Sequence, residues 1–334
     1  MHMADALLSP VIGGAFWTVS AGLIGISARK ITDESDASKT VLMGVLGAFV
    51  FAAQMINFTI PGTGSSGHIG GGLLLTVLLG PWRALLTIAS VLVIQALFFA
   101  DGGVLALGCN IFNLAVFPAF VAWPFIYRPL AGDGRSPARL AAGSIAAATA
   151  GLMAGAMSVV LQTSLSGVSD LPFVTFLLFM LPIHAVIGIA EGVLTWGVLS
   201  LLARTEPALL SGAEGSPRKT RRFAKALFMT ALAVSGLLSW FASSNPDGLE
   251  WSIAKITGKK GLPTASGPVH TLLADLQRRL APLPDYGFRD RPSPGLPEEA
   301  GTTFSGIAGS ILALALAGSA GLLLRRRQAR EERT

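Results

Sequence analysis

The sequence predicts an all-α protein that crosses a membrane several times. Of its 334 residues, 51% are hydrophobic and only 13% are charged, well below the roughly 25% charged residues of soluble domains. The apolar residues also form long segments that are almost free of charge, most of them close to the ~20 residues that a helix needs to cross a bilayer. Segments of this length favour helices over barrel strands, because backbone exposed to lipid must satisfy its hydrogen bonds internally.

Eight of these segments are expected to be spanning helices. They cover residues 10–28, 41–60, 84–100, 108–127, 138–163, 174–203, 223–242 and 304–324. A ninth apolar segment, residues 68–80, is too short to cross a typical bilayer alone. We expect it to be either a short helix completed by its glycine-rich lead-in or a re-entrant piece, and the sequence leaves open whether residues 61–80 span fully.

A polar, basic stretch divides the chain. Residues 204–222 contain prolines, glycines and several arginines, and this composition predicts a cytoplasmic linker. Before it, residues 1–203 form a predicted seven-helix body. After it, residues 223–334 form a predicted two-helix hairpin with a large outer loop, residues 243–303. Within that loop, the amphipathic stretch 269–280 is expected to form a surface helix.

The positive charge follows the predicted topology. With nine crossings and an extracytoplasmic N-terminus, seven of the 25 Lys and Arg residues fall in the outer loop and the remainder on the inner side. Long translocated loops are exempt from the positive-inside rule, so the bias predicts a multi-pass protein of the bacterial cell (inner) membrane with a cytoplasmic C-terminus. The net charge of +6 therefore indicates anionic lipid, not nucleic acid, as its partner.

Several features are missing from the sequence. The first residues lack the basic region and cleavage site of a removable signal peptide, so the mature chain is expected to begin at or beside Met1. The lone cysteine, Cys109, cannot form an internal disulfide. A P-loop motif and a His-Glu-x-x-His motif are also absent, so we expect neither ATP hydrolysis by a P-loop nor metalloprotease chemistry.

Two of the four histidines are predicted to meet. His2 stands at the outer N-terminus, and His68 opens the short third segment, which starts on the outer side. The amine of Met1, the backbone nitrogen of His2 and its Nδ1 close two chelate rings around one ion, and His68 adds a fourth nitrogen. Nitrogen ligands in one plane suit Ni(II) or Cu(II), whereas zinc prefers a tetrahedron.

The residues around His68 fit this use. The run from Gly62 to Gly72 is flexible and free of bulk, so backbone can approach a site closely. Outer hydrogen-bond partners for the ligands are expected from Ser65 and Ser66, and from polar groups at similar depth, namely Asn57, Asn110 and Asn113. Each feature also has an alternative without a metal. His2 can be a terminal surface residue, His68 can be a turn residue, and the glycine run can serve close helix packing.

The other two histidines have different settings. His184 and Glu191 lie seven residues apart in one predicted span, and hence on one helix face. Ionisable groups inside a membrane are costly, so a functional role is one hypothesis. A structural polar pair at a kink near Pro182 is the other. His270, in the outer loop, is expected to be solvated.

The chain contains five distinctive motifs: MHMADALLSP at 1–10, GHIGGGLLL at 67–75, LGPWR at 79–83, ADGGVLALGCN at 100–110 and PIHAVIGIAEG at 182–192. Together they resemble the CbiM/NikM family, the substrate-binding (S) components of energy-coupling-factor transporters for cobalt and nickel. This resemblance covers roughly residues 1–203. NPDGLEW at 245–251 resembles the PDGLE signature of the small CbiN/NikN component, here fused behind the linker over about residues 223–324.

The resemblance implies a function and a set of ligands. The ion is chelated by the terminal amine of Met1, the amide and imidazole nitrogens of His2, and the His68 imidazole. The implied partners are a membrane-embedded coupling (T) component and two cytoplasmic ATPases. Nickel is favoured as the bound substrate and cobalt stays open. Two other classes remain, an intramembrane enzyme that uses His184 and Glu191, and a non-transporting structural or sensory membrane protein.

Overall fold

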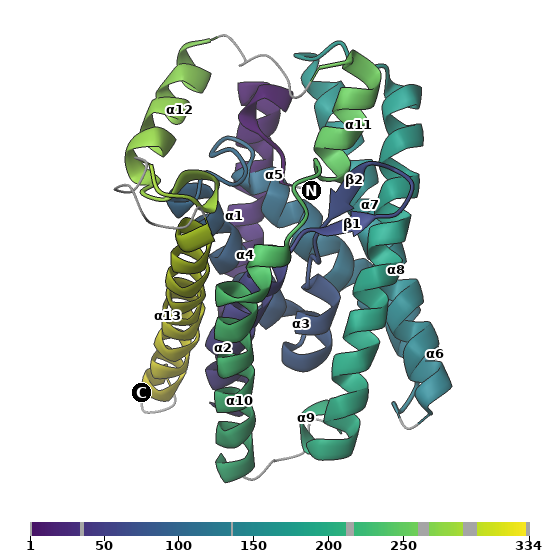
Figure 1. Cartoon of the computed structure of the whole chain (residues 1–334). Helices are drawn as coiled ribbons and strands as arrows, with labels where there is room; N and C mark the ends of the chain where they lie inside the picture. Colours follow the sequence, from purple (N-terminus) through teal and green to yellow (C-terminus); the bar gives the residue numbers. More distant parts are fainter. Residues whose placement is uncertain are drawn as a thin grey trace.

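A computed structural model of the chain describes residues 2–33, 37–134, 136–211, 217–259, 267–289 and 299–331, and it confirms the all-α class. The described residues form a bundle of long helices with one small β-hairpin (Figure 1). Within them, six helices are long and apolar enough to cross a membrane. Large apolar side chains on their outer faces are exposed, including Val11, Phe125, Leu165 and Leu178. A surface of this kind suits lipid and marks an integral membrane protein.

The first two predicted spans form helices, but the second helix ends at Gln54 instead of residue 60. A short 3-10 turn, η1 (Asp5–Leu7), leads into α1 (Pro10–Asp33), which is followed by α2 (Ala37–Gln54). The third segment forms α3 (Gly72–Leu79), whose eight residues extend only about 12 Å along the axis. Residues 61–80 are therefore not one spanning helix. Gly80 then turns the chain into α4 (Pro81–Phe98).

The next spans are longer than predicted. Residues 107–131 form one continuous helical segment. It consists of α5 (Leu107–Ile111), the π-helical stretch η2 (Phe112–Tyr127) and α6 (Arg128–Ala131). Pro118 and Pro124 lie inside η2, and because proline lacks an N–H group it breaks the regular α-helical ladder. The helices α7 (Pro137–Ser166) and α8 (Phe173–Thr205) pack against each other, and α9 (Ala208–Ser211) follows.

The second part of the chain packs on the first. The predicted hairpin consists of α10 (Pro217–Gly236), extended by the 3-10 turn η3 (Leu238–Phe241), and α13 (Glu299–Glu331). Both helices contact α2. A Cβ atom added at Gly44 of α2 would lie 2.7 Å from the carbonyl oxygen of Leu314, so α2 and α13 approach each other through small residues.

The segment between α10 and α13 is folded over the end of the bundle that holds the N-terminus (Figure 1). It contains α11 (Gly248–Thr257), α12 (Pro268–Leu280) and the 3-10 turn η4 (Pro284–Tyr286). We call residues 237–289 the cap segment. The predicted helix at 269–280 is confirmed as α12. The expectation that His270 is solvated was wrong, because His270 is buried and its Nε2 lies 2.9 Å from the carbonyl oxygen of Leu8.

A β-hairpin carries the chain from α2 to His68. Its strands β1 (Phe58–Ile60) and β2 (Ser65–Gly67) are antiparallel, with Thr59 opposite Ser66. Gly62 and Gly64 in the connecting turn have φ angles of 77° and 74°, which favour glycine because it has no Cβ. The first part of the glycine run thus forms the turn of a β-hairpin.

Candidate metal centre

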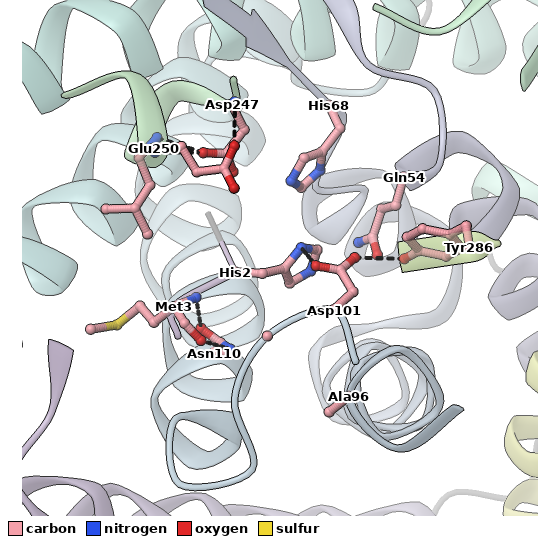
Figure 2. Close-up of polar contacts among 12 residues, drawn as sticks. His2, Met3, Gln54, His68, Ala96, Asp101, Asn110, Asp247, Glu250 and Tyr286 are labelled. Atoms are coloured by element: carbon pink, nitrogen blue, oxygen red, sulfur yellow. Dashed lines mark hydrogen bonds and ion pairs between the residues drawn. The ribbon is translucent and has the colours of Figure 1, made fainter. Parts of the chain in front are cut away.

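The N-terminal segment enters the bundle and is fixed by its backbone. The N–H of Met3 donates to Asn110 Oδ1 at 2.8 Å, and its carbonyl accepts from Asn110 Nδ2 at 3.3 Å and from the N–H of Gly103 at 2.9 Å (Figure 2). The Met3 side chain is fully buried. His2 is therefore carried into the protein interior, while Met1 lies outside the described residues.

Side-chain amides support this insertion. Asn113 and Gln162 exchange two hydrogen bonds of 2.9 Å, and Asn113 Nδ2 lies 3.7 Å from the sulfur of Met3. Asn110 and Asn113 thus hold Met3, the residue that follows His2. Asn57 is placed differently, since its carbonyl accepts the N–H of Ser243 in the cap segment.

The imidazoles of His2 and His68 lie side by side (Figure 2). Their ring centroids are 4.9 Å apart and their planes differ by 5°. Both side chains are buried. Two histidines that are distant in sequence therefore meet at the inserted N-terminus, where the sequence predicts them to meet.

Asp101, which follows α4, binds the His2 ring. Its Oδ1 lies 3.2 Å from His2 Nδ1, and its Oδ2 accepts a hydrogen bond of 2.5 Å from the hydroxyl of Tyr286 in the cap segment. Burial alone would raise the pKa of Asp101, but the neighbouring His2 and the two hydrogen bonds hold this pKa below its usual range. Asp101 is thus a carboxylate that links the candidate site to the cap segment.

The backbone is strained on both sides of this link. Within the described residues, the non-glycine positions with positive φ are Ala100, Asp285 and Tyr286, with values of 54°, 51° and 58°. Non-glycine residues rarely adopt this conformation, and when they do it is often at functional sites. Ala100 directly precedes Asp101, Asp285 directly precedes Tyr286, and Tyr286 itself binds Asp101.

The loop after His68 is anchored from two helices. Glu191 of α8 accepts the N–H groups of Gly70 at 2.7 Å and of Gly71 at 3.1 Å. Gln54 at the end of α2 donates to the carbonyl of Gly70 at 2.8 Å. A carboxylate with two backbone donors inside the bundle fixes the position of the loop, and thereby of His68.

The serines before His68 contact the cap segment. Ser66 donates from its hydroxyl to the carbonyl of Asn245 at 2.8 Å and from its N–H to the carbonyl of Pro246 at 2.8 Å. The Ser65 hydroxyl lies 3.4 Å from the same Pro246 carbonyl. The two serines, which we expected to support the ligands, instead bind the turn that precedes α11.

Asp247 completes that turn. Its carboxylate caps α11 by accepting the N–H groups of Leu249 at 2.9 Å and Glu250 at 2.8 Å, and Glu250 accepts the N–H of Asp247 at 3.2 Å. This reciprocal capping box fixes the start of α11. Burial opposes ionisation, but the Glu250 N–H and the nearby imidazoles of His68 and His184 help to lower the Asp247 pKa to about 2.

A small cavity lies between His68 and the turn. Its volume is about 10 Å³, and its polar lining comes from His68, His184 and Asp247. Burial lowers the pKa of His68 to about 3, because a charged imidazole loses its hydration there. His68 is therefore a neutral imidazole near pH 7, the form that binds metal ions.

His184 and Glu191 face the same region but do not pair. His184 Nδ1 lies 2.8 Å from the carbonyl oxygen of Met180, one turn earlier in α8. Glu191 binds the glycine loop, as described above. The two side chains thus contact different partners around His68.

Two acidic groups of the site were missed from the sequence. Asp101 lies within the motif at 100–110, and its place directly after a predicted span is the signal that could have identified it. Asp247 belongs to the PDGLE signature, but nothing in the sequence places that signature over His68. Within the described residues, no three His, Cys, Asp or Glu groups are placed to hold an ion, so two imidazoles require further donors.

Comparison with known proteins agrees with this architecture. Residues 2–209 match the family described as the cobalt uptake substrate-specific transmembrane region, CbiM, and residues 221–326 match the PDGLE domain. The fused nickel transport protein NikMN of Rhodobacter capsulatus is 30% identical over 86% of this chain and 88% of its own length. A protein of Archaeoglobus fulgidus that carries the same NikMN name is 35% identical over 95% of this chain and 96% of its own.

A solved structure shares the fold over about two thirds of the chain. A crystal structure of a transition metal transporter aligns with 64% of this chain and 97% of its own, at a TM-score of 0.54 and 29% identity. The family match covers more than half of the chain, and the match to the NikMN relatives continues through the PDGLE region. The chain belongs to the CbiM family of metal-uptake membrane proteins, in the fused form in which a PDGLE domain follows the CbiM region.

Proposed function

We propose that the protein captures a divalent transition-metal ion at the outer membrane face and delivers it for import. The observation that carries the proposal is the parallel placement of the His2 and His68 imidazoles, 4.9 Å apart, at an N-terminus that is inserted into the bundle. The ligands are the terminal amine of Met1, the amide nitrogen and Nδ1 of His2, and the His68 imidazole. Relatives named as nickel and cobalt transport proteins support the same class of ion.

Nickel is the favoured ion on chemical grounds. A deprotonated amide between an amine and an imidazole gives a planar set of strong nitrogen donors, which Ni(II) accepts readily. The stacked arrangement supports a site into which His68 brings one more nitrogen from a separate segment. Cobalt remains the second candidate, because a Geobacter sulfurreducens relative is named as a cobalt transport protein.

The proposal includes partners and an orientation. A membrane-embedded coupling component and two cytoplasmic ATPases of an energy-coupling-factor complex supply the driving force, since this chain carries no P-loop motif. The N-terminus and the cap segment face outward in the bacterial cell membrane, and the C-terminus faces the cytoplasm. Residues 1–203 form the metal-binding domain, 204–222 the linker and 223–334 the PDGLE domain.

The test compares metal binding by protein with a native N-terminus and a C-terminal tag. Wild-type protein is expected to bind one Ni²⁺ per chain with the absorption of a square-planar nitrogen site. His2→Ala and a form with one extra residue before Met1 are expected to lose both stoichiometric binding and uptake in cells, because each breaks the chelate. Asp275→Asn, an exposed change in α12, is the matched control.

Retention of one Ni²⁺ per chain by both altered N-termini would overturn the capture site. The enzyme alternative receives no support from the geometry, because Glu191 binds backbone N–H groups and His184 binds a carbonyl.

A further inference from the structure

The helix α12 carries an exposed stripe of apolar residues. Its members are Val269, Leu272, Leu276 and Leu280, which are between 39% and 67% exposed. Spacings of three and four residues place all four on one face of the helix. Single exposed leucines are ordinary on a protein surface, but a continuous stripe of this kind marks a contact with lipid or with another protein.

A different face of α12 contacts the bundle. His270 is buried, and its Nε2 lies 2.9 Å from the carbonyl oxygen of Leu8. Gln277 donates to the carbonyls of Ala96 and Gly102 at 2.9 Å and 2.7 Å. The apolar stripe is therefore not needed to hold α12 on the protein.

The remaining face of α12 is polar. Thr271 is exposed there, and the exposed guanidinium of Arg278 pairs with the carboxylate of Asp275 one turn earlier. A charged face together with a separate apolar stripe is typical of helices that lie in a membrane interface. In such helices the apolar side chains enter the outer part of the acyl region, while the charged side chains stay among the headgroups.

The contacts of α12 place it at the edge of the membrane-spanning region. α4 has 18 residues, so it is about 27 Å long, close to the ~30 Å of hydrocarbon in a bilayer. Its outer end therefore lies near the boundary between acyl chains and headgroups. Gln277 is bonded to Ala96 in the last turn of α4, and the N–H of Leu283, just after α12, donates to the carbonyl of Phe98. The apolar stripe thus lies at the depth of this boundary.

Aromatic side chains mark the same boundary. The indole of Trp240 donates to the hydroxyl of Thr303 near the start of α13, and the neighbouring Phe241 is 82% exposed. Phe288, which follows α12, packs against Phe304 of α13 with ring centroids 5.8 Å apart. Figure 1 shows α12 at the end of the bundle where α13 begins. Because tryptophan is enriched at membrane–water interfaces, the surroundings of α12 indicate lipid.

We propose that α12 is an interfacial helix whose apolar stripe inserts into the outer leaflet, between the headgroups and the acyl chains. Lipid is favoured over a protein partner because the stripe lies at the depth of that boundary, next to helices with exposed apolar outer faces. The choice of leaflet rests on the proposed function, which places the cap segment outside, whereas the contact with lipid does not. Since α12 also contacts Leu8 and Gly102, lipid anchors the cap segment beside the segments that carry His2 and Asp101.

The experiment uses the metal-free full chain in lipid nanodiscs large enough for two chains, with a nitroxide label on one introduced cysteine. Leu272→Cys and Leu276→Cys place the label on the apolar stripe, and Thr271→Cys, on the polar face, is the matched control. Cys109 is buried, and wild-type protein treated in the same way gives the background labelling. Relaxation of the nitroxide by O₂, which concentrates in hydrocarbon, is compared with relaxation by chromium oxalate, which stays in water.

The labels in Leu272→Cys and Leu276→Cys are expected to have a ratio of O₂ to chromium oxalate accessibility several-fold higher than the label in Thr271→Cys, without spin–spin broadening. Equal ratios in the three variants would overturn the proposal, because the stripe would then face water. Low accessibility to both reagents on the stripe would also overturn it, because protein would then cover the stripe, and spin–spin broadening would identify that protein as a second copy. Failure of Ni²⁺ capture is a separate result, which the binding test with His2→Ala decides.

Discussion

At the scale of single residues, Asp101 and the proposed metal ion compete for the same nitrogen of the His2 ring, Nδ1. In the structure Nδ1 faces Asp101, whereas the proposed chelate needs the same Nδ1 for the ion. Binding therefore requires the imidazole to leave Asp101 or to turn so that Nε2 faces the carboxylate. In the second arrangement Asp101 would accept from the ring nitrogen opposite the ion, a common partner of metal-bound histidine.

The first prediction concerns Asp101→Asn. The side-chain amide introduced at position 101 can still bind the His2 ring, so it still competes with the ion for Nδ1. The negative charge that Asp101 places beside the buried dication is lost. We expect Ni²⁺ affinity to fall by roughly 10- to 100-fold, measured by competition with a chelator of known affinity. Tyr286→Phe, which removes only the hydroxyl bonded to Asp101, should have a smaller effect. Equal affinities in Asp101→Asn and wild type would contradict this role.

The second prediction concerns the buried His68. In the unfolded chain its pKa is near 6.5, and in the folded chain burial lowers it to about 3. Between these values the unfolded state binds more protons, so the free energy of unfolding falls as the pH drops below about 6.5, by up to about 1.4 kcal/mol per pH unit. Thermal unfolding between about pH 7 and pH 5 should show a flatter pH dependence in His68→Gln than in wild type. Parallel curves would contradict the assignment of this proton to His68.

At the scale of elements, α8 controls the position of the His68 loop. Glu191 is the link, because its two carboxylate oxygens accept N–H groups from Gly70 and Gly71. Glu191 thus contacts the backbone of the loop after His68 and acts on the proposed ion site only through that loop. We regard it as a positioning residue.

The third prediction is that Glu191→Gln weakens Ni²⁺ binding. Glutamine has one acceptor oxygen where the loop presents two N–H donors, so its NH₂ group faces a donor. A buried donor left unpaired costs about 1–3 kcal/mol, and we expect a comparable loss of stability together with weaker binding in calorimetry. Glu206→Gln, at the end of the same helix, is the control. Normal stability and binding in Glu191→Gln would show that the loop does not depend on this carboxylate.

The contact between α2 and α13 is a second element-scale feature. The glycines Gly44 and Gly47 of α2 are small residues of the kind that allow close helix packing. In the structure Gly44 lies against the backbone of Leu314 and Gly318, and Gly47 lies near Ala317. The close approach joins the PDGLE hairpin to the CbiM region inside the membrane-spanning part of the molecule.

The fourth prediction follows from that contact. Gly44→Leu cannot be accommodated without moving α13, since even a Cβ would lie 2.7 Å from the Leu314 carbonyl. After proteolytic cleavage in the linker, we expect the Gly44→Leu protein to lose its C-terminal hairpin during purification, and the wild type to keep it. Gly25→Leu in α1, where a Cβ meets nothing within 4 Å, is the matched control. Co-purification of both fragments in Gly44→Leu would contradict the prediction.

At the scale of the whole molecule, the sequence predicted the long elements well and the tertiary contacts poorly. Apolar segments predict spans, because each helix that crosses lipid must be apolar along its own sequence. Counting the crossings then places His2 and His68 on the same side of the membrane. The positions of Asp247 and Tyr286 depend on how the cap segment folds back over the bundle, and no local pattern encodes that. His270 shows the same limit, because a polar loop residue was expected to be solvated and is buried against Leu8.

The cap segment contacts the candidate metal site at several points. His270 contacts Leu8, Gln277 donates to the carbonyls of Ala96 and Gly102, Tyr286 binds Asp101, and the turn before α11 binds Ser66. These partners lie on the segments that carry His2, His68 and Asp101. The PDGLE domain therefore contacts each segment that carries a residue of the candidate metal site.

The last prediction is that a chain ending at residue 211 has a loosened N-terminus. Without the cap segment, residues 2–8 and 99–103 keep the bonds between Met3 and Asn110 but lose the contacts to His270, Gln277 and Tyr286. We expect their amide hydrogen exchange to rise by about tenfold or more and Ni²⁺ loading to slow. The matched control is the full chain cleaved in the linker, because α10 and α13 stay packed on α2. Co-expression of residues 217–334 should restore protection, and exchange equal to that of the full chain in the shortened form would show that the CbiM region orders its N-terminus alone.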